Sequence, residues 1–187
     1  MLNLGYELET SVSINGIDYE LDMSFDNILR LQDLLSDEEV PGAAMIILAL
    51  DMLIGVRLDM EIEEQSDVLK LIFENFIRGE KLDTKTYDIA GNEMPSTETA
   101  KERVMSFTQD ANYIFASFMQ DYHIDLIEQQ GRLDWRKFVA LVDGLSKGTR
   151  LKEVIEIRTM ELPKGRNSAS QRKKVEEMKK KYALDKK

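Results

Sequence analysis

Cysteine is absent from the 187 residues, and His123 is the only histidine. Without thiols a chain has no disulfides, thiolate-bound metals or cysteine nucleophiles, and a single histidine excludes the histidine pairs of most metal and catalytic sites. The glycines are scattered, so no glycine-rich loop of the kind that cradles phosphates can form. These absences predict a protein that is not an enzyme and that needs no metal or cofactor.

Long hydrophobic runs are missing as well. The most apolar stretch, residues 43–54, contains Asp51 and is well short of the ~20 residues that a membrane-spanning helix requires. No basic and then apolar signal segment opens the chain, because Glu7 and Glu9 follow within the first ten residues. We therefore expect a cytoplasmic protein with no membrane partner.

The charge is divided unevenly along the chain. Residues 1–100 hold 6 basic and 22 acidic residues, a net charge of −16, whereas residues 101–160 are neutral and residues 161–187 carry +6. The overall charge of −10 opposes binding to nucleic acid over the whole surface, since a phosphate backbone would be repelled. Five lysines of the basic tail are candidates for self-association with the acidic half of another copy: Lys173, Lys174, Lys179, Lys180 and Lys181. A solvated basic tail on an acidic, solubilising body is the alternative.

Residues 10–21 predict a β-hairpin. Asn15 and Gly16 suit a type I′ turn between two alternating runs. This register places Ile14 opposite Ile17 and Val12 opposite Tyr19, which makes one side of the hairpin apolar. An isolated hairpin is marginally stable, so we expect it to lie on the helices that follow.

Helical periodicity dominates the rest of the chain. The sequence therefore predicts a mainly α fold with a small N-terminal β-hairpin, an α+β helical bundle whose basic C-terminal helix frays when it has no partner. The expected order is an acidic hairpin-plus-helices region at 1–79, a mobile connection at 80–100, a helical region at 101–162 and a basic tail at 163–187. We expect these to form one compact domain plus the tail.

The helix expected between Pro41 and Gly55 is apolar on nearly all sides, which is typical of a central core helix or of a partner-binding surface. Its side chains cannot all face inward in a two-layer domain, and methionine suits adaptable hydrophobic contacts. The candidate partner-binding residues are Met45, Ile46, Leu48, Ala49, Met52 and Leu53. The alternative is ordinary core packing, because apolar side chains fill most protein interiors. We expect it for about half of these positions.

The C-terminal half resembles a known family. Residues 110–126, 131–138 and 157–160, together with Leu145 and Pro163, are similar to the "gene product fifteen" family of long-tailed bacteriophages. The N-terminal hairpin and the lysine-rich tail also fit, so the resemblance covers nearly the whole chain. His123 is a departure, because the family pattern leads us to expect glycine there, and that leaves the end of the preceding helix in doubt.

The resemblance implies a role in tail morphogenesis. Genes of this family usually lie just before the tape-measure gene, where tail assembly chaperones are encoded. The implied function is a non-enzymatic chaperone that binds the tape-measure protein in the cytoplasm of the infected host and is absent from the mature virion. Other tail proteins and further copies of this chain are the other implied partners. The alternatives are a structural adaptor retained in the virion tail and a small regulatory protein that contacts nucleic acid through its basic tail.

Overall fold

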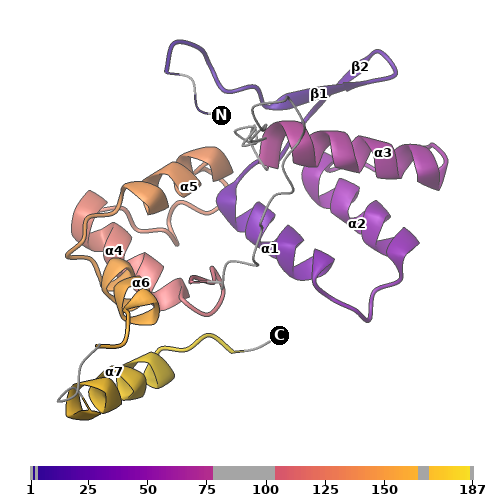
Figure 1. Cartoon of the computed structure of the whole chain (residues 1–187). Helices are drawn as coiled ribbons and strands as arrows, with labels where there is room; N and C mark the ends of the chain where they lie inside the picture. Colours follow the sequence, from indigo (N-terminus) through magenta and orange to yellow (C-terminus); the bar gives the residue numbers. More distant parts are fainter. Residues whose placement is uncertain (1, 3, 78–103, 164–168, 186–187) are drawn as a thin grey trace, which may run out of the picture. The chain divides into compact units, whose positions relative to one another are not determined.

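The computed structural model describes residues 2, 4–77, 104–163 and 169–185. The described chain is mostly helical with one two-stranded antiparallel hairpin (Figure 1), which confirms the α+β prediction. The elements in chain order are β1 (Ser11–Ile14), β2 (Ile17–Glu20), α1 (Phe25–Leu35), α2 (Gly42–Ile54), α3 (Ile62–Ile72), the π-helical turn η1 (Phe73–Ile77), α4 (Ala111–Tyr122), α5 (Trp135–Gly144), α6 (Arg150–Thr159) and α7 (Ala169–Lys181). The connection expected at residues 80–100 lies outside the described residues.

The contacts divide the chain into two compact units. The first consists of residues 1–96 and 129–140, and the second of residues 97–128 and 141–187. Residues 129–140 therefore pack in the first unit, although they belong to the second half of the sequence. The regions predicted from the sequence treat residues 101–162 as one region. They do not include this exchange of residues 129–140 with the first unit.

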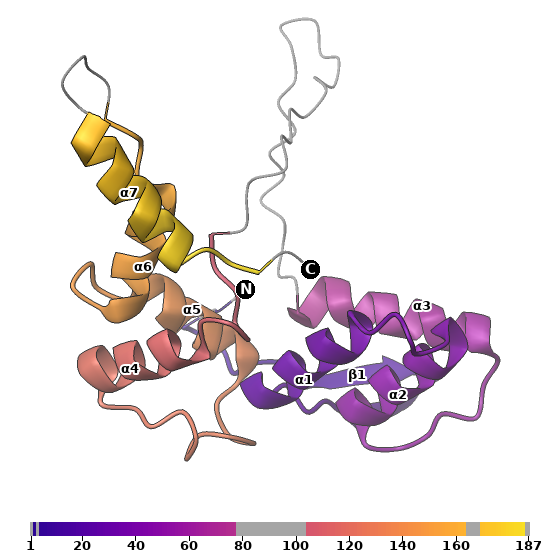
Figure 2. The same cartoon turned by 90° about the horizontal axis from the view of Figure 1, so that it is seen from below.

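In the first unit the hairpin lies over one face of α1, α2 and α3 (Figures 1 and 2). Its register is the expected one, with Ile14 opposite Ile17 and Val12 opposite Tyr19. Asn15 and Gly16 have φ of 51° and 80°, the positive values that a type I′ turn demands. Val12 and Ile14 are buried against the helices. Ile17, beside the turn, is 57% exposed, so at the tip of the hairpin the apolar side chain of β1 is covered and that of β2 is not.

Three buried aliphatic side chains hold the three helices of this unit together: Ile28 of α1, Leu53 of α2 and Ile72 of α3 all have no exposed surface. Glu61 precedes α3, and Glu63 and Glu64 lie in its first turn, where the helix dipole favours carboxylates. The acidic run before α3 thus has a structural explanation.

The segment 129–140 is fastened to the first unit by backbone and ring contacts. The Phe25 N–H donates to the Leu133 carbonyl at 2.9 Å, and the Trp135 N–H donates to the Met23 carbonyl at 2.7 Å. The Phe25 ring stacks on Phe138 with centroids 4.8 Å apart. The start of α5, from Trp135 onward, is therefore core of the first unit.

The second unit packs α4 against α6. Phe118 of α4 and Leu151 and Val154 of α6 have no exposed surface. The Ser117 hydroxyl joins the two helices by accepting the Leu151 N–H at 3.0 Å while donating to the Tyr113 carbonyl at 2.6 Å. A buried hydroxyl satisfied on both sides costs little, and it fixes the offset between the helices.

Among the described residues, none of the helices is long and apolar enough to cross a membrane.

Candidate functional site

Helix α2 separates its apolar side chains into a buried side and a partly exposed side. Ala49 and Leu53 have no exposed surface and Leu50 is 2% exposed, whereas Leu48 is 43% exposed. Met45 and Met52 are half-buried. Positions 45, 48 and 52 are spaced i, i+3 and i+7, so they share one side of the helix. We call these three residues the α2 stripe.

The six residues predicted to bind a partner therefore fall into three groups. Ala49 and Leu53 lie in the core of the first unit and offer no surface to a partner, as expected for part of the set. Ile46 is half-buried, and its i, i+3 and i+7 spacing to Ala49 and Leu53 places it on the buried side of the helix. Met45, Leu48 and Met52 remain accessible, and the structure brings them together in one stripe.

The C-terminal end of α2 is held by Asn27, which no sequence pattern singled out. Asn27 is 4% exposed, and its amide donates to the Met52 carbonyl at 2.8 Å and to the Asp22 carbonyl at 2.9 Å. Gly55 ends the helix with φ of 75°, the left-handed conformation that favours glycine. These contacts fix the α2 stripe relative to α1, so the stripe is presented on a rigid element.

The five candidate lysines lie on α7 and are solvated. Lys173, Lys174, Lys180 and Lys181 are exposed and Lys179 is half-buried. Val175 is the buried residue of this helix, at 8% exposure. A helix this polar has little stability of its own, so its position depends on the contacts at its C-terminal end.

The C-terminal anchor of α7 is Tyr182. The Arg150 guanidinium donates to the Tyr182 hydroxyl at 2.8 Å and lies 5.4 Å from the centre of its ring and 5.7 Å from that of Tyr113. Two hydrogen bonds raise the pKa of Arg150 above its ordinary value: the bond to Glu153 has the larger effect, and the bond to Tyr182 has the next largest. The expected fraying of this helix is thus opposed by cation–π and hydrogen-bond contacts within the second unit.

A buried ion pair supports the same region. Arg158 donates to both carboxylate oxygens of Asp110 at 2.7 Å, and it also donates to the Tyr182 carbonyl at 2.6 Å. Asp110 is 1% exposed and accepts the Ser106 N–H at 3.0 Å. No sequence pattern identified Asp110 as the partner of Arg158.

His123 lies at the end of α4 with φ of 55° and ψ of 33°, and its N–H bonds to the Phe118 carbonyl. The helix thus stops where the family pattern places glycine, and the histidine adopts the left-handed conformation instead. Its side chain is exposed. Within the described parts of the chain, there is no group of three or more His, Cys, Asp or Glu side chains that could hold a metal ion.

Comparison with known proteins gives one match. The model of a family described as "Bacteriophage Gp15 protein" matches residues 4–184. No curated protein matches, and no solved structure does.

Proposed function

The chain belongs to the bacteriophage Gp15 protein family, and we propose that it is a non-enzymatic tail assembly chaperone that binds the tape-measure protein during tail morphogenesis. It acts in the cytoplasm of the infected host and leaves before the virion matures. Three features support this proposal: the family, the gene position that the resemblance implies, and the α2 stripe.

The α2 stripe is the observation that carries the proposal. An amphipathic client helix docks by laying its apolar side on a partner's hydrophobic surface through i, i+3, i+4 and i+7 anchors. Leu48, at 43% exposure, lies between two methionines, whose flexible thioethers adapt to clients of varied sequence. The acidic charge of residues 1–100 keeps the chaperone soluble while this apolar surface is free.

Release follows from weak, repeated contacts. A stripe of three side chains buries little area, so one copy binds a client helix weakly, whereas many copies along a long client bind with avidity. A polymerising tail tube then displaces the copies one at a time. Other tail proteins and neighbouring copies of this chain are the further partners that we propose.

The experiment is co-purification of the tape-measure protein with Leu48→Lys. Because Leu48 is exposed, the variant should unfold at nearly the same denaturant concentration as the original chain. The buried lysine charge at the interface should nevertheless reduce recovery of the client at least tenfold. Ile127→Lys is the matched control, since Ile127 is 65% exposed in the second unit. Equal recovery with both variants contradicts a role for the α2 stripe.

A further inference from the structure

The outer edge of β1 carries backbone groups that β2 does not use. In a hairpin with a two-residue turn, hydrogen-bonded pairs alternate with non-bonded pairs. Ile14 and Ile17 flank the turn, and the Leu21 N–H donates to the Thr10 carbonyl at 2.7 Å, so the bonded positions of the first strand are 10, 12 and 14. The N–H and C=O groups of Ser11 and Ser13 therefore face away from β2.

These four groups have no hydrogen-bond partner among the described residues. An open strand edge is a template for another extended segment. Ser11 and Ser13 offer two donors and two acceptors in the spacing of a β-ladder. Such an edge is ready to receive a third strand.

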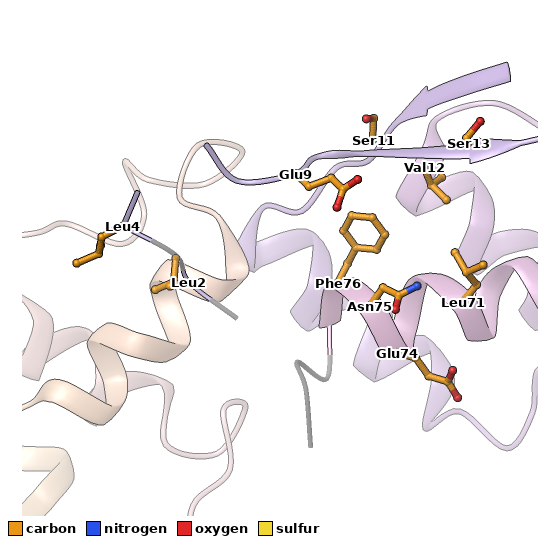
Figure 3. Close-up of a pocket in the computed structure, with 10 residues that line it drawn as sticks. All are labelled: Leu2, Leu4, Glu9, Ser11, Val12, Ser13, Leu71, Glu74, Asn75 and Phe76. Atoms are coloured by element: carbon orange, nitrogen blue, oxygen red, sulfur yellow. The ribbon is translucent and has the colours of Figure 1, made fainter. Parts of the chain in front are cut away.

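A groove of about 770 Å³ runs beside this edge. Residues of β1 and of α3 and η1 line it, and no residue of β2 does. In Figure 3 the side chains of Val12 and Leu71 point toward one another across the groove, and the ring of Phe76 lies below Glu9. Val12 and Phe76 are buried, whereas Leu71 is 45% exposed. Leu71 is thus the accessible apolar side chain of β1, α3 and η1 in a groove whose other exposed lining side chains on these elements are polar.

The π-helical turn η1 lines part of the groove. A single π turn inserted at the end of an α-helix is uncommon, and such turns are frequent at functional sites. Here it carries Phe76, Glu74 and Asn75 into the lining.

The charge of the groove selects the occupant. Among the residues that the structure describes, its charged lining residues are Glu9 and Glu74, both exposed. A second copy would bring together two segments that each carry −16 over residues 1–100, which opposes pairing of two β1 edges. A partner segment with basic residues is attracted instead.

We propose that the β1 edge binds an extended segment of a partner protein. An apolar side chain of that segment enters the groove against Leu71, and its lysine or arginine residues lie near Glu9 and Glu74. The segment adds to the hairpin as a third strand by β-augmentation. The edge from Ser11 to Ile14 is about 13 Å long at ~3.3 Å per residue, so a segment of five to seven residues covers it. This site is separate from the α2 stripe, and the chaperone proposal does not depend on it.

The test is the binding of a fluorescent seven-residue peptide in which three valines alternate with two threonines between terminal lysines. Ser13→Pro removes an N–H from the β1 edge without removing a bond to β2. Asp18→Pro is the matched control, because Asp18 is paired with Ser13 in the register and its N–H faces the opposite edge. We expect saturable binding that Ser13→Pro weakens about tenfold and Asp18→Pro changes less than twofold.

Charge reversal gives a second readout that does not depend on proline. Glu74→Lys should weaken binding of the lysine-ended peptide and strengthen binding of the same peptide with terminal glutamates. Absence of saturable binding, equal losses with the two proline variants, or indifference to Glu74→Lys overturns the proposal. Dimers of the original chain that Ser13→Pro abolishes would show that a second copy occupies the edge and would overturn it too.

Discussion

Arg158 connects three segments of the second unit through one guanidinium. It bonds to Asp110 at the start of α4, to the Val104 carbonyl at 2.9 Å and to the Tyr182 carbonyl. Spacing places Arg158 on the packed side of α6, but the identity of a charged partner 48 positions away is a property of the fold. For the same reason the sequence did not single out Asn27, whose amide bonds to carbonyls of two different segments.

Replacing Arg158 with alanine should lower the free energy of unfolding by about 3–5 kcal/mol, because the carboxylate of Asp110 is left buried and unpaired. Urea denaturation followed by circular dichroism measures this change. Lys70→Ala is the control, since Lys70 and Asp67 form an exposed pair at 3.0 Å that should be worth about 0.3–0.5 kcal/mol. Similar small losses in both variants would mean that the Arg158–Asp110 pair contributes no more than a surface pair.

Individual elements differ in how far their sequence determines them. The hairpin was predictable in register as well as in position, because the Asn15–Gly16 turn and the alternation around it are local. Helix α2 was predictable as a helix, but an apolar sequence on all sides cannot indicate which side chains stay accessible. The packing of α2 against α1 and α3 decides that Met45, Leu48 and Met52 stay accessible.

The end of α4 gives a prediction for a single helix terminus. His123 adopts φ of 55°, which costs an L-residue about 1–2 kcal/mol, and glycine avoids that cost while losing more chain entropy on folding. His123→Gly should therefore raise the free energy of unfolding by about 0.5–1 kcal/mol in a thermal or urea titration.

Ser36→Gly is the matched control for this terminus. Ser36 ends α1 with φ of −95°, so glycine relieves no strain there and should lower stability. A gain at both positions, or a loss at position 123, would contradict the strained cap.

For the whole molecule, periodicity indicated that the chain is mainly helical but not which helices pack together. The spacing of Trp135 and Phe138 fits a helix, but it does not indicate that they pack with Phe25 in the first unit. The interleaving of residues 129–140 with residues 1–96 depends on long-range contacts. Charge segregation, in contrast, is visible in the sequence and bears directly on association between copies.

We expect the lysines of α7 to meet carboxylates of residues 1–100 in another copy. A mixture of isotopically light and heavy chains, cross-linked without a spacer, should give mixed lysine–carboxylate links at low salt that decline at 0.5 M salt, where screening shortens the Debye length to about 4 Å. A variant with Lys173, Lys174, Lys180 and Lys181 replaced by glutamine should give fewer mixed links. Links confined to single chains in a monodisperse monomer would contradict this association.

The most direct measurement of the central claim is the solubility of the tape-measure protein of the same phage, expressed with and without this chain. If the chain shields apolar helices of that client, the soluble fraction should rise severalfold on co-expression, and Leu48→Lys should reduce the gain while Ile127→Lys preserves it. A client that is equally soluble in the presence and absence of the chain would contradict the account.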